Sequence, residues 1–140
     1  DIKANKKAIV IGGSGGIGSS VCLALAEEGY DIAIHYNKNI SSAQKVSRKI
    51  SELKSKSHIF KGDITNSIEI QSAIESAIDR LGGVSVLVNC ATSAIPTIKF
   101  NDLLWEDFEI HLNNQIKGVF NAIKTVVPHM EQKNMERLLI

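Results

Sequence analysis

The chain has 140 residues, of which 44% are hydrophobic and 22% are charged, and its formal net charge is +1. These values are typical of one globular domain with a hydrophobic core. Because the sequence has no long block of one charge sign and no apolar run of roughly 18 residues, it gives no basis for nucleic-acid binding or for a membrane-spanning helix.

The first predicted element is a strand over residues 8–11, a β-branched run suited to a buried position. A glycine-rich segment follows, and then a helix that ends at Gly29, a residue type favoured just after helices. Its buried stripe is expected at Ile17, Val21, Ala24 and Leu25. The chain therefore opens with a strand, a glycine turn and a helix.

Two further strand–helix pairs follow. A strand over 31–35 precedes a helix that begins at Ser41 or Ser42 as a cap and runs to about residue 53. A strand over 59–61 precedes a helix opened by Asn66 and Glu69, which together resemble a capping box, and closed by two glycines at 82 and 83. Its core face is expected at Ile70, Ile74, Ala77, Ile78 and Leu81.

The last part of the chain predicts a strand over 84–88, a long helix over about 104–127 and the start of a strand over 137–140. Pro128 is expected near the end of this helix, where its missing N–H does least harm. The inward residues of the helix are expected to be Phe108, Leu112, Ile116, Val119, Phe120, Ile123 and Val127.

Alternating strands and helices with short connections predict an α/β fold, a doubly wound parallel sheet of the Rossmann type with a helix layer on each face. We expect residues 1–140 to form one nucleotide-binding domain, interrupted at its fifth strand. The longest predicted loops, 37–42 and 92–102, follow strands and so lie at the carboxyl edge of the sheet, where such folds bind ligands.

Residues 9–21, IVIGGSGGIGSSV, contain two overlapping glycine patterns. Gly13, Gly15 and Gly18 form G-x-G-x-x-G, whereas Gly12, Gly16 and Gly18 form G-x-x-x-G-x-G. Glycines between a strand and a helix allow the backbone to approach a pyrophosphate, which the helix N-terminus attracts. Both patterns therefore favour dinucleotide binding over a plain turn, and the sequence around the loop alone leaves the choice between them open.

Cys22 and Cys90 form no C-x-x-C motif, so we expect two reduced thiols in a cytoplasmic protein, with one disulfide as the alternative. No basic residue near Cys90 in sequence favours a thiolate there, and Cys22 is expected to pack in the core. The four histidines have no metal-ligand spacing, so no metal site is expected.

Other motifs follow the glycines in a fixed order: Asp63 after the third strand, Asn89-Cys90-Ala91-Thr92 after the fourth, and Phe108 and Gly118 ten residues apart in the long helix. Together with G-x-x-x-G-x-G, they make residues 6–140 resemble the short-chain dehydrogenase/reductase family, close to its 3-oxoacyl-(acyl-carrier-protein) reductases. The chain departs from the family pattern at Ile11, where the family has Thr, and at two places of the family's N-N-A-G segment.

The resemblance implies a set of cofactor-binding residues. Asp63 corresponds to the acid that binds the adenine amino group, with Ile64 beside the ring; without the resemblance, Asp63 is interpreted as a turn or cap acid. Asn89, Cys90 and Ala91 correspond to the strand end under the cofactor ribose. The loop residues implied are Gly12, Ser14, Gly16, Ile17 and Gly18.

The end of the second strand predicts which nicotinamide cofactor is bound. NAD-specific enzymes usually place a carboxylate there, but this chain has Tyr36, Asn37 and Lys38. No acid repels a 2′-phosphate, and Lys38 and Asn37 are suited to contact one. We therefore predict NADP(H); the alternative for Lys38 is a solvated surface lysine.

The family's catalytic Ser and its Tyr-x-x-x-Lys are not in the chain, because Tyr30 and Tyr36 are followed four positions later by Ile34 and Ile40. We expect these residues beyond Ile140, with the substrate loop. Alignment on Phe108 and Gly118 puts Gln115 at the position of the family's helix Asn, which helps to hold a water in its proton relay. A slip of one residue would put Asn114 there instead.

The resemblance implies an oxidoreductase that transfers hydride between NADPH and the carbonyl of a small molecule, favouring reduction of a 3-oxoacyl thioester, and a homodimer or homotetramer. The sequence leaves two alternatives open. One is a non-catalytic, nucleotide-binding member of the family. The other is a different Rossmann enzyme, such as a methyltransferase that uses G-x-G-x-x-G, although the acid expected at the end of its second strand is missing.

Overall fold

The computed structural model describes residues 6–92, 97–132 and 138–140. Within them, a parallel five-stranded sheet has the order β3-β2-β1-β4-β5. Its strands are β1 (Lys7–Ile11), β2 (Asp31–Tyr36), β3 (Ser57–Lys61), β4 (Val86–Asn89) and β5 (Leu138–Leu139). The predicted strands are confirmed, with ends that differ by one or two residues.

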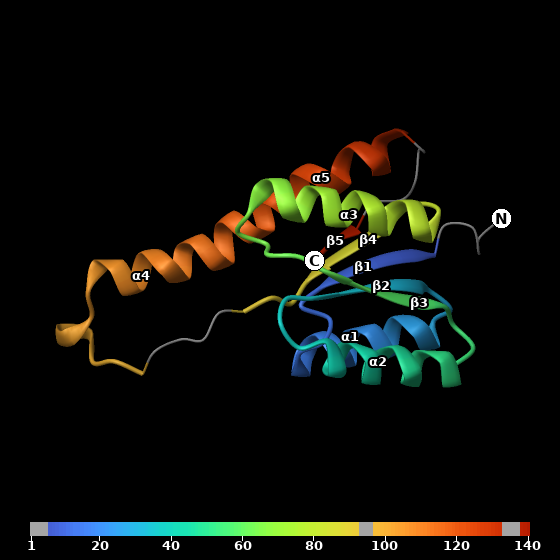
Figure 1. Cartoon of the computed structure of the whole chain (residues 1–140), viewed down its shortest axis with the longest axis horizontal. Helices are drawn as coiled ribbons and strands as arrows, with labels where there is room; N and C mark the ends of the chain where they lie inside the picture. The colour runs from blue at the N-terminus through green and yellow to red at the C-terminus, as the bar shows by residue number, and fades with distance from the viewer. Residues whose placement is uncertain (1–5, 93–96, 133–137) are drawn as a thin grey trace.

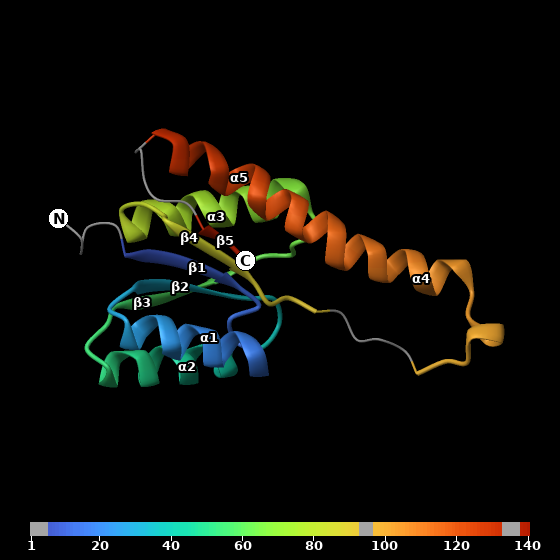
Figure 2. The ribbon, with the colours of Figure 1, turned by 180° about the vertical axis from the view of Figure 1, so that it is seen from behind.

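Helices cover both faces of the sheet (Figures 1 and 2). The helix α1 (Gly16–Glu27) and the helix α2 (Ile40–Glu52) lie on one face, and α3 (Ser67–Leu81) and α5 (Gly118–Gln132) lie on the other. The remaining helical segments are η2 (Phe100–Asp102), α4 (Trp105–Leu112) and the π-helical η3 (Asn113–Lys117). The α/β prediction of a doubly wound, three-layer fold is confirmed.

The central strand β1 contributes side chains to two hydrophobic cores, because alternate side chains point to opposite faces of a sheet. Ile9 and Ile11 pack in the core under α3 and α5, whereas Ala8 and Val10 pack in the core over α1 and α2. All four are completely buried. This two-sided burial explains why β1 is continuously apolar rather than alternating.

The predicted core face of α3 is confirmed. The predicted stripe of α1 is wrong at Ile17 and Ala24, which are exposed, and is confirmed at Val21 and Leu25, which are half-buried against the core. The buried residues of α1 are Gly18, Cys22 and Ala26, and Ile17 is 74% exposed. Gly18 packs directly against the backbone of Gly12 and Gly13, and this contact fixes the rotation of the helix about its axis. The turn before the helix therefore decides which face is buried.

The helix caps differ in part from those predicted. Asn39, rather than Ser41 or Ser42, caps α2 by accepting a hydrogen bond from the Ser42 N–H, so the preceding loop is shorter than 37–42. Asn66 caps α3 through the Glu69 N–H, as predicted, but the Glu69 carboxylate accepts from Asp63 N–H rather than completing a capping box. Both asparagine caps satisfy an otherwise unpaired helical N–H.

The long helix is confirmed over its predicted range, but it contains a π-helical turn and continues past Pro128 to Gln132. Buried Met130 packs against the core and holds this last turn in place, at the loss of one backbone hydrogen bond. The predicted inward face is wrong at Phe108, Ile116 and Phe120, which are exposed. The face that packs on the sheet instead carries Gly118, Asn121, Ala122, Thr125, Val126 and Met130.

Acid is expected to destabilise the fold through His58, on β3. Burial and the charge of Arg80 lower its pKa from 6.5 to about 4, and its Nε2 atom is buried without a hydrogen-bond partner among the described residues. Since the folded state favours the neutral ring, stability is fully present above pH 6.5 and is lost as the pH falls from there to about 4. Urea unfolding midpoints should therefore decrease over this range.

The His58→Gln variant isolates this effect, because the carboxylates that titrate in the same range are common to both proteins. The midpoint of the variant should decrease less with acid than that of the parent chain. Equal decreases in the two proteins would rule out His58 as the source of the acid sensitivity.

Candidate functional site

A cleft of about 490 Å³ opens at the carboxyl edge of the sheet, where β1, β2, β3 and β4 end. This is the edge at which parallel α/β sheets bind ligands. The residues that line the cleft are Gly12, Ser14, Gly15, His35, Tyr36, Asn37, Lys38, Asn39, Asp63, Ile64, Thr65, Cys90, Ala91, Thr92 and Asn114.

The turn after β1 requires glycine at two of its positions. Gly12 has a φ of 70°, and a Cβ atom there would lie 2.6 Å from the Ala91 backbone nitrogen. A Cβ atom on Gly18 would overlap the carbonyl oxygen of Gly12. These two glycines therefore let the start of α1, the end of β1 and the end of β4 approach one another.

Gly16, by contrast, has no atom within 4 Å of the position that a Cβ atom would take. It is the first residue of α1, and the preceding Gly15 has no side chain to cap the helix. The first turn of α1 also has no acidic residue. The fold leaves open space in front of an uncapped helix N-terminus, which is the environment that a phosphate group prefers.

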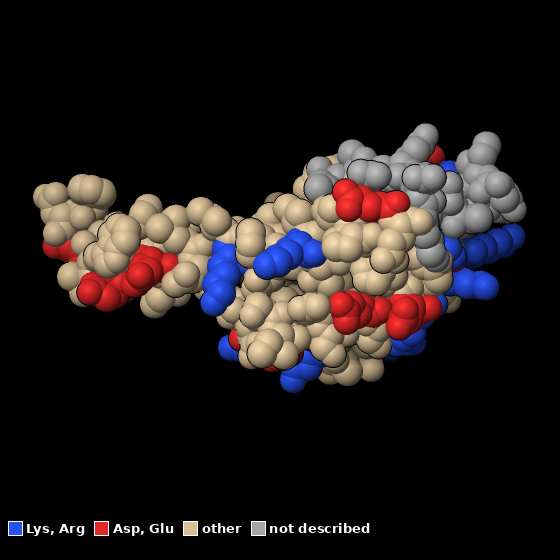
Figure 3. Space-filling view, turned by 90° about the horizontal axis from the view of Figure 1, so that it is seen from above, with Lys and Arg blue, Asp and Glu red and all other residues tan. Residues whose placement is uncertain are grey.

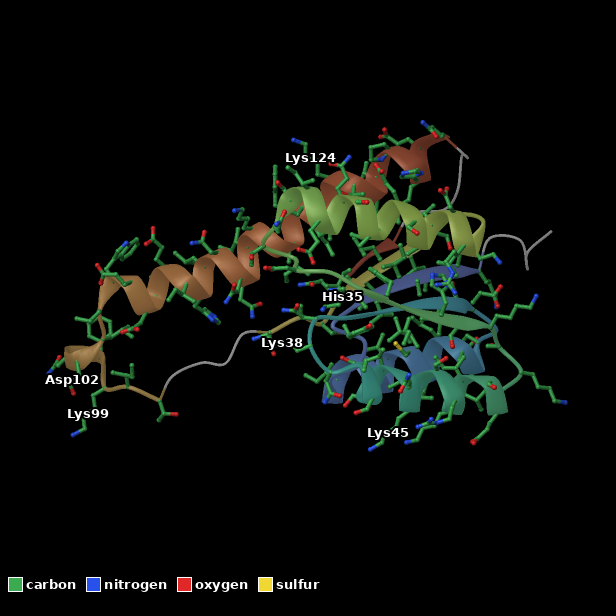
Figure 4. The ribbon with its side chains drawn as sticks, viewed as in Figure 1. His35, Lys38, Lys45, Lys99, Asp102 and Lys124 are labelled. Carbon is green, nitrogen blue, oxygen red and sulfur yellow. The ribbon has the colours of Figure 1, made fainter. Side chains whose placement is uncertain are left out.

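The end of β2 forms one wall of the cleft. Tyr36 is half-buried and packs against the core beside α2, and Asn37 and Lys38 are exposed. Asn39 accepts hydrogen bonds from Ser42 N–H and Ser41 Oγ, so its side chain is used to begin α2. Figure 4 places Lys38 at the open edge of the sheet.

The end of β3 forms the next wall. Asp63 Oδ1 accepts hydrogen bonds from Thr65 Oγ1 at 2.7 Å and from Thr65 N–H at 2.9 Å. These bonds are the main reason that the pKa of the Asp63 carboxyl is lowered, and the charges of His35 and Lys117 contribute less. Asp63 thus acts as a turn acid, and its carboxylate stays ionised at the rim of the cleft.

The residues at the end of β4 line two different cavities. Cys90 and Ala91 line the main cleft, whereas Asn89 lines a smaller cavity of about 230 Å³ together with Val119 and Ile140. The Asn89 Oδ1 atom is buried and has no hydrogen-bond partner among the described residues. Burial raises the pKa of the Cys90 thiol, which disfavours a thiolate there, and both cysteines are free.

The π-helical turn η3 brings Asn114 to the cleft, whereas Gln115 does not line it. A π-helical turn holds one residue more than an α-helical turn, so it rotates the residues before it relative to those after it. Gly118, at the start of α5, packs against the Ile64 side chain and leaves no room for a larger residue. Contact with Ile64 therefore fixes the position of the helix at Gly118, and the π-helical turn η3 changes the orientation of the residues that precede Gly118.

The structure thus brings nine of the predicted site residues to the cleft and leaves five outside its lining. The nine are Gly12, Ser14, Tyr36, Asn37, Lys38, Asp63, Ile64, Cys90 and Ala91. The five are Gly16, Ile17, Gly18, Asn89 and Gln115.

Sequence reasoning did not assign a site role to several lining residues. The strongest of these is His35, a polar residue at the end of an apolar strand, where its position at the carboxyl edge was an available signal. Thr65 and Thr92 follow strand ends in the same way, and Asn39 follows β2.

One face of the molecule carries a mixed distribution of charge (Figure 3). On the face that Figure 3 shows, basic and acidic side chains lie in small groups and no extended surface of one sign is present. The described residues contain no group of three or more His, Cys, Asp or Glu side chains placed to hold a metal ion. Among the same residues, no helix is long and apolar enough to cross a membrane.

A parallel sheet with the order β3-β2-β1-β4-β5, a glycine turn after β1 and a cleft at the carboxyl edge define a dinucleotide-binding protein of the Rossmann class. The sequence model of the family described as short chain dehydrogenase matches residues 6–138. The chain belongs to this family.

Individual proteins agree with this assignment. The 3-oxoacyl-(acyl-carrier-protein) reductase FabG of Staphylococcus epidermidis is 34% identical over 128 residues, which cover 90% of this chain and 51% of the reductase. A NAD+-bound xylitol dehydrogenase structure is 27% identical with a TM-score of 0.89, covering 97% of this chain and 52% of the dehydrogenase. The acetoin dehydrogenase YohF of Salmonella typhimurium is 30% identical with a TM-score of 0.84, covering 96% and 56%.

The chain therefore spans about half the length of these relatives. Family membership favours the G-x-x-x-G-x-G interpretation of the loop and rules against the methyltransferase alternative.

Proposed function

We propose that the chain binds NADP(H) and is the cofactor-binding part of an oxidoreductase that transfers hydride between NADPH and a carbonyl substrate. The observation that carries the cofactor choice is the end of β2, where Lys38 lies at the cleft. The xylitol dehydrogenase neighbour is NAD+-bound, so the family alone does not select the cofactor.

The end of β2 favours a 2′-phosphate over a free ribose hydroxyl. The lining residues there are Tyr36, Asn37, Lys38 and Asn39, none of which is acidic. An ammonium group binds a phosphate through a charge-assisted hydrogen bond, which is roughly twice as strong as a neutral one. The carboxylate of Asp63 lies on a different strand end, after β3, and we assign it to the adenine amino group.

The other parts of the cleft fit the remaining groups of the cofactor. The open N-terminus of α1 at Gly16 and Ile17, backed by Gly18, suits the pyrophosphate, with Ser14 beside the adenosine ribose. Ile64 supplies an apolar contact for the adenine, and the strand end at Asn89, Cys90 and Ala91 lies under the second ribose in this proposal. The nicotinamide, when bound, supplies the hydride.

The helix amide of the active site is assigned to Asn114 or Gln115. Asn114 lines the cleft and Gln115 does not, and this supports Asn114 in place of the Gln115 that alignment predicts. In the larger protein, the Asn114→Ala substitution should then lower the rate of hydride transfer more than Gln115→Ala, with little change in cofactor affinity for either.

The Lys38→Ala variant tests the cofactor choice. Loss of a charge-assisted contact costs about 1.5 to 3 kcal/mol, so the affinity for NADPH should fall by about tenfold or more. The affinity for NADH, which lacks the 2′-phosphate, should change little. Fluorescence titration of both cofactors gives the two dissociation constants.

Lys45→Ala is the matched control, because Lys45 is exposed on α2 and points away from the cleft (Figure 4). It removes the same charge without removing a cleft residue. If Lys45→Ala weakens NADPH binding as much as Lys38→Ala, or if NADH binds as tightly as NADPH to the parent chain, the assignment of NADP(H) is wrong.

The proposal places the family's Ser and Tyr-x-x-x-Lys in a longer domain of which residues 1–140 are the N-terminal part, because the chain spans about half of its relatives. We favour a 3-oxoacyl thioester as substrate, since FabG is named for that reaction. We also propose a cytoplasmic location. Consumption of NADPH with a 3-oxoacyl thioester tests this activity, and cofactor binding without turnover would identify a non-catalytic member.

A homodimer or homotetramer is part of the same proposal. The arm formed by α4 and η3 projects from the body of the molecule in both ribbon views (Figures 1 and 2) and exposes Trp105, Phe108, Ile110 and Ile116. Exposed apolar surface of this kind is typical of a protein interface.

A further inference from the structure

His35 joins three strand ends beneath the cleft. It is the fifth residue of β2, and only 2% of its surface is exposed. The N–H of Gly12, after β1, donates a hydrogen bond to His35 Nδ1 at 3.0 Å. On the other side of the ring, His35 Nε2 lies 2.7 Å from the carbonyl oxygen of Gly62, after β3.

These two contacts fix the protonation state of the ring. Since Nδ1 accepts a hydrogen bond, it carries no proton, and Nε2 must carry the proton that it donates to the Gly62 carbonyl. Both nitrogens are used, and the Phe60 ring packs beside the imidazole with a centroid separation of 5.4 Å. A proton on Nδ1 would face the Gly12 N–H directly and break that bond.

The two groups that His35 binds follow the strands on either side of β2. Gly12 begins the glycine turn, whose open N-terminus at Gly16 faces the proposed pyrophosphate. Gly62 directly precedes Asp63 and Ile64, which form the proposed adenine wall. The imidazole of His35 therefore links these two parts of the cleft through its two hydrogen bonds.

Resting on the proposed cofactor function, we propose that His35 is a positioning residue for the dinucleotide, and that its neutral ring holds the glycine turn and the β3–α3 loop at the separation that binding requires. Protonation of the ring releases the Gly12 N–H and weakens dinucleotide binding. His35 does not touch the reacting atoms and acts through Gly12 and Gly62.

The surroundings of the ring determine how it responds to acid. Burial lowers the pKa of His35 from 6.5, and this outweighs the hydrogen bond to Gly62 and the charge of Asp63, which raise it. The other titratable groups on the elements around it are Glu69 on α3, which binds Asp63 N–H, Lys117 on η3, whose charge acts on Asp63, and Cys90 after β4. The contact is thus complete at neutral pH and is lost as the pH falls below 6.5 through the lowered value.

The first experiment measures hydrogen-exchange protection of the Gly12 amide by NMR, which does not depend on any ligand. The variant His35→Asn offers an amide oxygen near the position of Nδ1 and does not titrate, whereas His35→Leu offers no acceptor. We expect at least tenfold lower protection of Gly12 in His35→Leu than in the parent chain, and restored protection in His35→Asn. As the pH falls from about 7.5 to about 4.5, protection should decrease in the parent chain more than in His35→Asn.

The second experiment measures the dissociation constant of NADPH by fluorescence over the same pH range. The cofactor's 2′-phosphate, whose pKa is about 6, titrates in every sample, so only the difference between proteins is used. We expect the parent chain to lose at least fivefold more affinity than His35→Asn. The control His58→Gln, which alters a histidine outside the cleft lining, should behave as the parent chain does.

The possible results separate the role of His35 at Gly12, its effect on NADPH binding and the cofactor proposal. Parallel loss of Gly12 protection in the parent chain and His35→Asn overturns the role of His35, even if His35→Leu does not fold. Equal acid responses of NADPH affinity overturn its link to binding. If Gly12 responds as expected but NADPH binds to none of the proteins, the cofactor proposal fails while the contact itself is established.

Discussion

Replacing Gly18 with alanine is expected to destabilise the chain by roughly 4 kcal/mol, a large part of the stability of a typical domain. The added methyl group would overlap the carbonyl oxygen of Gly12 and lie 2.9 Å from the Gly13 Cα atom. Both neighbours are backbone atoms, so no side-chain rotation relieves the overlap. Either α1 must move away from the sheet or the turn must change its shape.

Urea denaturation gives the size of this effect. With a slope of about 2 kcal/mol per molar, the midpoint should fall by about 2 M. The control is Gly82→Ala, because Gly82 has a φ of 78° but no atom within 4 Å of an added Cβ atom. That variant suffers only the left-handed backbone cost, about 1 kcal/mol. A Gly18→Ala midpoint no lower than that of Gly82→Ala would show that the contact between α1 and the turn is not tight.

Elements that depend on local chemistry could be predicted from the sequence. Three such features act over only a few residues and are present in the structure: the β-branched run of β1, the Asn66 cap of α3 and the glycines that end α3. The core face of α3 was also predictable, since no backbone contact opposes the hydrophobic pattern there.

Elements that depend on close backbone contacts could not be predicted in this way. The periodicity of α1 placed Ile17 inward, but the fit of Gly18 against Gly12 turns the helix so that Ile17 is 74% exposed. Similarly, Phe120 is 60% exposed because small residues of α5, beginning at Gly118, take the positions against the core and Ile64. Hydrophobic periodicity finds an apolar face but does not say what covers it.

The candidate site shows the same division. The carboxyl edge and most of the cleft residues follow from the strand ends, which the sequence marks clearly. Asn114 lines the cleft and Gln115 does not, and this depends on the π-helical turn, which the spacing of Phe108 and Gly118 does not reveal. His35 has no motif, and its role depends on two backbone groups from strands that are distant in sequence.

Replacing Gly16 with glutamate is expected to abolish measurable dinucleotide binding while leaving the fold intact. The position has open space around an added Cβ atom, and a carboxylate in the first turn of a helix is favourable, so the free energy of unfolding should stay equal or rise by up to about 1 kcal/mol. In the proposed complex, the pyrophosphate takes the same space. Two like charges about 4 Å apart near a protein surface repel by about 4 kcal/mol, so the dissociation constant of NADPH should rise on the order of 100-fold or more.

Two further variants separate the causes. Ser72→Glu adds the same charge at an exposed position on α3 that does not line the cleft, and it should leave the affinity for NADPH within about twofold. Gly16→Ala adds bulk without charge, so its affinity should lie between those of the parent chain and Gly16→Glu. Gly16 differs in this respect from Gly12 and Gly18, where the protein's own backbone fills the space that a Cβ atom would take; nothing in the described structure requires glycine at position 16. If Gly16→Glu binds NADPH as the parent chain does, the pyrophosphate does not lie at the start of α1, and the open space there has no role in cofactor binding.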